Sequence, residues 1–386
     1  MQTRSMAMEE GKELPVPSRT IQARVLPLKL LLFFLLFLGV GIAFIIISML
    51  MSRHFYVDNV IIPATSNRVQ PCFQEPLSFR SWIKPPSTVW HTMNDSQLFW
   101  RASFDPQITS YPFKRVPKIA FMFLTRGPLP MARLWDRYFK GHEEHYSIYI
   151  HALPSYVEDY PPSSAFYRRQ IPSQVAEWGM MSMCDAERRL LANALLDISN
   201  EWFILLSEAC IPLQSFPIAY LYLSISDISY MGSYDDPGPF GRGRYNDNMA
   251  PLVNLSDWRK GSQWFEVNRK LAIDIVKDDT YYPIFEKFCR PACYVDEHYF
   301  QTMLSIHSPH LLANRSLTWT DWSRGGAHPA TFGAADMEKK FFKNIIEKQK
   351  CMFHNQTSSA CFLFARKFAP SALDTLLAHS FEFFGY

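Results

Sequence analysis

The chain has 386 residues, of which 48% are hydrophobic, 15% aromatic and 19% charged, and its formal net charge at pH 7 is +3. This composition is typical of a folded domain and excludes an intrinsically disordered chain, which has too few apolar residues to form a core. The net charge is too small to indicate a nucleic-acid-binding protein, because such proteins neutralise many phosphates with Lys and Arg.

An uncharged apolar run occupies residues 30–51 near the N-terminus. As a helix it would be roughly 33 Å long, enough to cross the hydrocarbon core of a membrane, which is about 30 Å thick. The alternative is a cleaved signal peptide, which has an apolar region of about 7–15 residues and a small-residue cleavage site. The segment after the run, Ser52-Arg53-His54-Phe55, offers no such site. We therefore expect a membrane anchor.

The charges on the two sides of this run predict its orientation. Two basic residues, Arg53 and Arg68, follow it closely. The basic residues that precede it are Lys12, Arg19, Arg24 and Lys29. Because cytosolic flanks carry the excess of Lys and Arg, we expect residues 1–29 to be a cytosolic tail and the rest to be luminal. This is the arrangement of a single-pass type II membrane protein.

Two further signals agree with a luminal location. Glycosylation sequons begin at Asn94, Asn254, Asn314 and Asn355. Such sequons are used only in the secretory lumen. The chain also has seven cysteines, which predicts disulfides with one thiol left over in an oxidising compartment. Cys351 and Cys361 enclose a short loop and are the best candidate pair.

The other cysteines are harder to assign. Cys289 and Cys293 are four residues apart, a spacing that fits either a metal site or a disulfide. No second Cys or His pair lies at zinc spacing, so the disulfide is favoured. Cys210 is expected to be a buried free thiol. The partners of Cys72, Cys184, Cys289 and Cys293 cannot be deduced from the sequence.

Residues 52–115 are rich in proline and lack sustained periodicity, apart from a short helical stretch at 95–101. This predicts a luminal stem. Regular structure begins with an apolar strand at 118–125, a helix at 129–141 and a second strand at 146–152, which together indicate a βαβ unit. A helix at 180–196, a strand at 202–206 and a helix at 216–224 continue the alternation.

Residues 232–251 are dense in Gly, Pro, Asp and Asn and predict a long loop. After it we expect a strand at 263–267, helices at 269–277, at 282–288 and from about Asp296, a strand at 316–322, an amphipathic helix at 337–350, a strand at 362–368 and a last helix capped by Ser371 and Asp374. Residues 116–386 therefore predict one α/β domain with a mostly parallel sheet, whose ligands gather at the carboxyl ends of the strands.

The sequence contains no Walker loop, GxSxG, HExxH or GxGxxG motif, and three local clusters remain as candidates for chemistry. The first is Asp296-Glu297-His298. A carboxylate in the first turn of a helix is held ionised by the exposed amides, which suits a proton acceptor. An ordinary helix cap is the alternative, and the residues by themselves favour it.

The second cluster is Phe364-Ala365-Arg366-Lys367-Phe368, in which two cations flanked by aromatic residues could bind a diphosphate without a metal. Solvated charges at a strand edge are the alternative. The third is Tyr234-Asp235-Asp236-Pro237-Gly238, whose acids resemble an Mn²⁺-binding motif, although their position before Pro-Gly favours a turn.

Other side chains could contact a substrate. Arg242 and Arg244 lie in the same long loop as the adjacent acids. Trp264, Trp319 and Trp322 offer flat apolar faces on which sugar rings could stack, and core packing is the alternative for each tryptophan.

Seven segments in this order resemble the core-2/I-branching β-1,6-N-acetylglucosaminyltransferase family, especially its plant branch, over residues 117–370. They are PKIAFMFLTRG, HYSIYIHA, SEACIPLQSF, GSQWF, DEHYF, LTWTDWSRGGAHPATF and FARKF. The resemblance implies a type II Golgi membrane enzyme with a GT-A-like fold. It also implies a UDP-sugar donor, a glycan or glycoprotein acceptor, inversion at the anomeric carbon, and no metal or other cofactor.

The resemblance also implies roles for single residues. Glu297 matches the general base, and Lys367, with Arg366, matches the diphosphate-binding position. Trp322 matches an acceptor-site tryptophan, and we group Trp264, Arg242 and Arg244 with it. The nucleotide contacts fall on Thr125, Arg126 and His151, although the animal enzymes have an aspartate at the position of His151. Residues 232–251 match the family's acceptor segment poorly.

N-acetylglucosamine is the expected donor sugar, and relatives that transfer glucuronic acid or xylose provide the alternatives. A membrane-anchored carbohydrate-binding scaffold without turnover would need the aromatic residues but neither Glu297 nor Lys367. A hydrolase would need a second catalytic carboxylate, which cannot be assigned. The sequence leaves the donor sugar, the acceptor, the oligomeric state and catalytic competence open.

Overall fold

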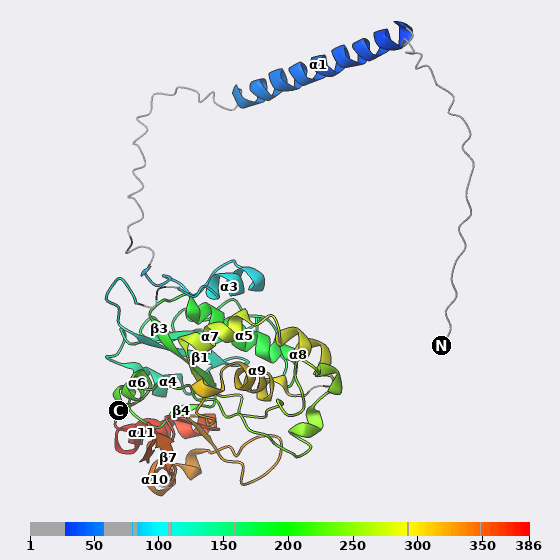
Figure 1. Ribbon diagram of the computed structural model, residues 1–386. Coiled ribbons are helices and arrows are strands. Elements are labelled where there is room, and N and C mark those ends of the chain that lie inside the picture. Colours follow the sequence, from blue (N-terminus) through cyan, green and yellow to red (C-terminus); the bar gives the residue numbers. More distant parts are fainter. Residues whose placement is uncertain are drawn as a thin grey trace, which may run out of the picture. The chain divides into compact units, whose positions relative to one another are not determined.

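A computed structural model describes residues 28–57, 79 and 83–386, without 107, 109, 158, 292 and 348, and within the first segment it describes the side chains of residues 32–49. The chain divides into two compact units, residues 1–74 and 75–386 (Figure 1).

The first unit contains helix α1 (Leu28–Val57). Within the described residues, its segment Leu32–Met49 is the one stretch long and apolar enough to cross a membrane, and all of its side chains are exposed. Exposed apolar side chains on every face of a helix need an apolar surrounding, which a bilayer supplies. The helix therefore fits the expected anchor. Of the tail expected at residues 1–29, residues 1–27 lie outside the described residues, as do Arg68 and Cys72.

The second unit is built on a four-stranded sheet with the order β2-β1-β3-β5. Strands β1 (Lys118–Leu124), β2 (Tyr146–His151) and β3 (Asn200–Ser207) run parallel, and β5 (Glu266–Asn268) runs antiparallel at one edge. The mostly parallel α/β sheet predicted from the sequence is confirmed. Nearly every residue of β1 is buried, as expected for a strand that is covered on both faces.

Helices cover both faces of this sheet (Figure 1). One face packs against α5 (Met181–Leu195), α7 (Arg269–Lys277), α8 (Tyr282–Phe288) and α9 (Tyr299–His307). The other packs against α4 (Ala132–Phe139), α6 (Phe216–Ser224), α10 (Lys339–Glu347) and α11 (Leu373–Phe384). Two hydrophobic cores result, one on each face.

A second sheet with the order β4-β9-β6 completes the unit. It contains β4 (Ile211–Pro212), β6 (Thr318–Thr320) and β9 (Phe364–Arg366). A hairpin of β7 (Cys351–Phe353) and β8 (Gln356–Ser358) is an element that the sequence analysis missed. Its turn residues, His354 and Asn355, both have positive φ, which is typical of a two-residue hairpin turn.

The predicted stem needs a correction. Helix α3 (Asp95–Ala102) buries Leu98 and Ala102 against the domain, and its Asp95 pairs with Arg189 of α5 at 2.7 Å. The compact unit accordingly begins at residue 75, well before the boundary expected at residue 116. The proline content of this region was misleading, because a proline-rich segment without regular structure can still pack on a folded domain.

Two expected helix starts also differ. Ser371 does not cap α11, because Pro370–Ala372 forms a 3-10 turn and the helix starts after Ala372, with no side-chain cap. Glu297 does not lie in the first turn of an α-helix. It ends a 3-10 turn, Val295–Glu297, and α9 begins two residues later.

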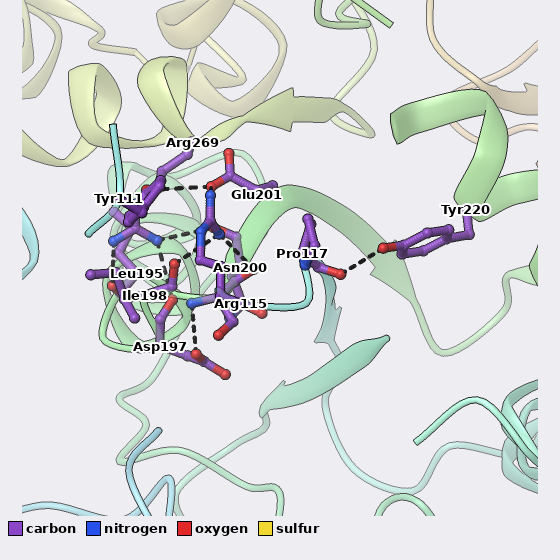
Figure 2. A network of polar contacts seen from close by, with 11 residues as sticks. Tyr111, Arg115, Pro117, Leu195, Asp197, Ile198, Asn200, Glu201, Tyr220 and Arg269 are labelled. Atoms are coloured by element: carbon purple, nitrogen blue, oxygen red, sulfur yellow. Dashed lines mark hydrogen bonds and ion pairs between the residues drawn. The ribbon is translucent and has the colours of Figure 1, made fainter. Parts of the chain in front are cut away.

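A polar network joins the amino ends of the strands (Figure 2). Arg269 donates to the carbonyl oxygens of Leu195, Asp197 and Asn200 at 2.9–3.1 Å. Arg115 forms an ion pair with Glu201, and its guanidinium lies 3.8 Å from the ring centroid of Tyr111. The arginines thus satisfy carbonyl groups where α5 ends and β3 begins. This network lies at the end of the sheet away from the carboxyl ends of the strands.

The structure contains the disulfide expected between Cys351 and Cys361, whose Cα atoms are 5.6 Å apart. It also joins Cys289 to Cys293. Cys184 and Cys210 are buried free thiols.

Candidate active site

The carboxyl ends of the parallel strands bring together the donor-side candidates. Leu124 of β1 is in register with His151 of β2 and with Ser207 of β3, so all three strands end together. The second sheet delivers β9 to the same place, because the amide of Phe368 donates to the carbonyl of Ala209 at 3.0 Å. Arg366 and Lys367 therefore lie beside the end of β3.

The guanidinium of Arg366 lies 4.3 Å from the ring centroid of Trp264. Burial lowers the pKa of Arg366, and the nearby groups of Cys210 and Glu208 oppose this shift. Its Nε atom has no hydrogen-bond partner among the described residues. Lys367 is half-buried, and its ammonium makes no hydrogen bond or ion pair with another described residue. Two cations thus lie at this edge with unused donors, which fits an anionic ligand.

Glu297 is held by two cations through one of its oxygens. Its Oε2 accepts from Nζ of Lys260 at 2.6 Å and from Nη1 of Arg244 at 3.1 Å. In the described part of the chain, Oε1 has no partner, and the side chain is 27% exposed. The positive charge beside this carboxylate, expected from a helix terminus, comes in the structure from Lys260 and Arg244.

A short segment, residues 260–264, links Glu297 to Arg366. Lys260 binds the Glu297 carboxylate, the amide of Gly261 donates to the Glu297 carbonyl at 2.9 Å, and Trp264 packs under Arg366. Gly261 and Trp264 are three residues apart, so their Cα atoms are separated by at most about 11 Å. Glu297 and Arg366 therefore lie on the same side of the molecule.

Hydrogen bonds to neighbouring side chains hold the segment 260–264 in place. Gln263 donates to Oε1 of Glu187 at 2.7 Å, and Gln301 donates to the carbonyl of Ser262 at 2.9 Å. A Cβ atom at Gly261 would lie only 1.7 Å from the carbonyl oxygen of Gly232, so no other residue fits there without backbone movement. The segment is therefore closely constrained where it contacts Glu297.

Two further carboxyl groups are buried behind Glu297. Burial and the neighbouring Glu297 raise the pKa of Asp296 to about 7, although Arg244 and Lys260 oppose the shift. Burial and Asp296 raise the pKa of Glu187 well above its ordinary value. Burial therefore favours the protonated form of both acids.

His298, the residue after Glu297, has a structural environment. Its ring stacks on Trp258 with 4.5 Å between centroids, and its Nδ1 donates to the carbonyl of Arg259 at 2.8 Å. Burial lowers the pKa of His298 to about 4, so the ring is neutral at physiological pH. The ring thus orients the segment that leads to Lys260 without adding charge.

The three residues expected to contact the nucleotide lie in different environments. Thr125 is buried and its hydroxyl donates to the carbonyl of Gly127 at 3.1 Å, whereas Arg126 is exposed. His151 is 1% exposed, and its Nε2 accepts from the amide of Gln174 at 3.4 Å. Burial and the charge of Arg189 lower the pKa of His151 to about 3. His151 therefore supports the edge of the sheet from inside and presents almost no surface to a ligand.

The residues expected to bind the acceptor also lie in different parts of the structure. Arg244 contacts Glu297, whereas the exposed Arg242 forms an ion pair with Asp235 at 2.5 Å. Trp264 is 5% exposed and contacts Arg366, so it lies with the donor-side candidates and offers little exposed surface to an acceptor. Trp322 is 51% exposed in the loop that follows β6.

The adjacent acids at 235 and 236 form a turn. The amide of Gly238 donates to Oδ1 of Asp236 at 2.8 Å, as in an Asx-turn, while Asp235 is paired with Arg242. In the described part of the chain, no three His, Cys, Asp or Glu side chains are grouped so as to hold a metal ion.

All four sequon asparagines, Asn94, Asn254, Asn314 and Asn355, are exposed. Asn94 caps α3 through its side-chain oxygen, and the oxygen of Asn314 accepts from the amide of Ser233. Both contacts use the side-chain oxygen. The amide nitrogen, the atom to which a glycan would be attached, takes no part in them. Modification of these sites stays a prediction.

Three residues of the site, Lys260, Glu187 and Gln263, were not predicted from the sequence. Lys260 directly precedes the GSQWF segment, which is the one available signal for it. The long separation along the chain between Lys260 and Glu297 explains why no local pattern revealed their contact.

A cavity of about 1050 Å³ lies elsewhere. It is lined by Lys118, Tyr146 and Ser147, which are at the amino ends of β1 and β2. Ligands of parallel α/β sheets bind at the opposite, carboxyl ends. We therefore locate the candidate active site at Glu297 and Arg366 rather than at this cavity.

Comparison with known proteins gives the family. The sequence model of the core-2/I-branching enzymes matches residues 119–346, a range that contains Glu297 and ends before Arg366. The rice (Oryza sativa subsp. japonica) protein named glycosyltransferase BC10 is 35% identical over 300 residues, which cover 66% of this chain and 74% of the rice protein. The chain therefore belongs to the core-2/I-branching enzyme family, and this membership supports a role in glycosyl transfer.

Proposed function

We propose that the protein is an inverting glycosyltransferase that moves a sugar, N-acetylglucosamine, from a UDP-sugar to a glycan acceptor without a metal ion. The observation that carries the proposal is the arrangement of Glu297. Its Oε2 is held by Lys260 and Arg244, whereas in the part of the chain that the structure describes its Oε1 has no partner. A carboxylate that is fixed at one oxygen and open at the other suits a general base.

In the proposed reaction, Oε1 of Glu297 accepts the proton of an acceptor hydroxyl as that oxygen attacks C1 of the donor sugar. The new bond forms on the face opposite UDP, and the bond between C1 and the UDP oxygen breaks. The leaving UDP takes the electron pair of the broken bond. Inversion at C1 follows from this single displacement.

Lys367 and Arg366 would stabilise the charge that develops on the departing diphosphate. Arg366 is partly buried against Trp264 and has an unused donor at Nε, and Lys367 follows it in the chain. Cations in a partly dry site act more strongly than in water, which lets them serve in the place of a divalent metal.

One alternative is a transferase with the same fold that moves glucuronic acid or xylose. The other is a non-catalytic carbohydrate-binding scaffold, which would also use the exposed aromatic residues. The unpartnered Oε1 favours the enzyme, because a scaffold has no need of a reachable base. We further propose that the protein is a single-pass type II protein of the Golgi membrane with its catalytic domain in the lumen.

The test is a donor screen with the full-length chain in detergent, in which UDP release from several UDP-sugars is measured with mixed glycan acceptors. Glu297→Gln keeps the shape of the side chain but removes its basicity, so turnover should fall by about 100-fold or more. Donor binding and thermal stability should be retained. Glu144→Gln, a change at an exposed residue, is the matched control and should have full activity.

A second arm of the same assay adds EDTA, and activity should be unchanged. Loss of activity that Mn²⁺ restores would contradict metal independence and would make Asp235 and Asp236 candidate ligands. Full turnover in the Glu297→Gln variant would remove Glu297 from its role. A screen with no UDP release from any donor would favour the scaffold.

A further inference from the structure

Two large aromatic side chains are exposed beside the candidate base. Trp178 is 43% exposed and Phe240 is 64% exposed. They are 62 positions apart in the chain, and they come from the loop before α5 and from the long loop after α6. Exposed aromatic surface costs hydrophobic free energy, and where such residues gather they commonly mark a binding site.

A series of contacts joins both residues to Glu297. The ring centroids of Trp178 and Tyr294 are 4.7 Å apart, and the guanidinium of Arg244 lies 4.2 Å from the centroid of Tyr294. The same guanidinium lies 5.4 Å from the centroid of Phe240 and donates to Oε2 of Glu297 at 3.1 Å. Arg244 therefore contacts Phe240 and Glu297 directly, and Tyr294 connects it to Trp178.

The loop after β6 also reaches this surface. The ring of His328 lies 5.1 Å from that of Trp178. Phe332, four residues farther on, donates its amide to the carbonyl of Lys367 at 2.9 Å. The aromatic surface is thus connected through this loop to the donor-side cations.

Backbone constraints fix both aromatic positions. Gly179, next to Trp178, has φ of +78°, and a Cβ atom there would lie 3.2 Å from the ring of Tyr294. Gly241, next to Phe240, leaves so little room that a Cβ atom would lie 2.3 Å from the carbonyl oxygen of Asp236. Each aromatic residue therefore precedes a glycine that the local packing requires. The two side chains are presented by constrained turns.

The chemistry of the surface matches a sugar ring. A pyranose has apolar C–H faces and a rim of hydroxyl groups, so it can stack on an aromatic ring while its hydroxyls bond to charged side chains. The aromatic residues here are interspersed with Arg244, Glu297, Arg242 and Asp235. A lipid surface or an apolar protein partner would take these ion pairs out of water and offer no further hydrogen bonds to them, so a carbohydrate is the better occupant.

On the basis of the proposed function, we propose that Trp178 and Phe240 form a stacking surface for the acceptor, and that they bind pyranose rings on either side of the hydroxyl presented to Glu297. The acceptor is then an oligosaccharide of two or more sugar units rather than a monosaccharide. The two rings are contributed by different loops, so each stacks a different sugar unit.

The test measures glycan binding directly with the full-length chain in detergent and without any donor. The probes are chitotriose, cellotriose and xylotriose, each compared with its monosaccharide by saturation-transfer NMR. We expect at least one trisaccharide to bind more tightly than its monosaccharide. Trp178→Ala and Phe240→Ala should each weaken that binding by about 3- to 10-fold, the size of one aromatic contact.

Trp100→Ala is the matched control, because Trp100 is 69% exposed on α3 and contacts Phe104 away from Glu297. It should bind the trisaccharide as the unchanged protein does. Thermal stability is measured for all three variants, so a folding defect is recognised. A fourth variant, Trp178→Phe, keeps an aromatic ring and should restore most of the binding.

Failure of all three trisaccharides to bind would overturn the proposal, as would binding that is equally strong in the Trp178→Ala and Phe240→Ala variants. The measurement needs no turnover. If the proposed transfer reaction were wrong but the surface real, the trisaccharide would still bind and the UDP-release assay would be negative. Failure of the stacking surface can therefore be distinguished from failure of the proposed transfer reaction.

Discussion

Asp296 and Glu297 are neighbours in sequence but have opposite environments. The side chain of Glu297 is partly exposed and paired with two cations, whereas Asp296 is 3% exposed and its Oδ1 has no partner among the described residues. The difference arises because the 3-10 turn directs consecutive side chains to different sides. One acid is available to a substrate, and the other is part of the interior beside Glu187.

The buried acid predicts a pH dependence of stability. The pKa of Asp296 is about 7 in the folded protein, against about 3.9 in an unfolded chain. Between these values the folded state binds more protons, so the free energy of unfolding should fall as pH rises from about 4 to 7. Asp296→Asn cannot ionise and should make this decrease shallower. Urea unfolding at several pH values between 4.5 and 7.5 measures the slope.

Other groups contribute to the same slope. Glu187, Cys184, Glu297, Arg244 and Lys260 surround Asp296, and of these Glu187 also has a raised pKa because of burial. The Asp296→Asn variant should therefore retain part of the decrease. Asp279→Asn, at an exposed position, serves as the control. A slope in Asp296→Asn that equals that of the unchanged protein would contradict the buried proton.

Among the elements, α6, α7 and α8 have the boundaries predicted from the sequence. Helix α7 shows why. Its N-cap, Asn268, accepts from the amide of Leu271, and the apolar residues that follow recur with helical spacing. Strands β5, β6 and β9 are shorter than predicted, because strand length depends on how far a partner strand runs alongside. Local sequence does not contain that information.

Arg269, the first residue of α7, leads to a prediction at this scale (Figure 2). It satisfies three carbonyl oxygens where α5 ends and β3 begins. Arg269→Ala removes a charged donor from each of these carbonyl oxygens, of which that of Asp197 still accepts from the amide of Asn200. We expect the free energy of unfolding to fall by about 2–4 kcal/mol. Lys270→Ala removes one of the two cations that pair with Asp274 and leaves Lys277 at 2.7 Å, so it should cost about 1 kcal/mol or less. Urea unfolding of both variants compares them, and similar small losses would contradict the role of Arg269.

At the scale of the whole molecule, the anchor and the domain lead to a prediction about orientation. The basic residues before α1 should keep the N-terminus in the cytosol. In sealed microsomes, added protease should therefore remove an N-terminal tag but leave the domain intact, and endoglycosidase should increase its gel mobility. Permeabilised microsomes provide the control, in which the domain is digested. Digestion of the domain in sealed microsomes would contradict the predicted orientation.

The fold class and the family followed from local patterns. Apolar runs of strand length alternating with helical periodicity predicted the parallel α/β sheet, and ordered short motifs pointed to the core-2/I-branching enzymes. Both were confirmed. The sequence also singled out Glu297, Arg366 and Lys367, whose catalytic roles stay predictions. These features could be read because each depends on residues that are close together in the chain.

By itself, then, the sequence determined the apolar segment, the alternation of elements and the candidate charged residues. The tertiary structure alone decided what those residues touch. Lys260 and Arg244 reach Glu297 from 37 and 53 positions away, Trp264 is buried under Arg366, and α3 packs on the domain instead of lying in a stem. The reason is that burial and charge pairing depend on which distant segments the sheet brings together, whereas periodicity reports only on neighbours along the chain.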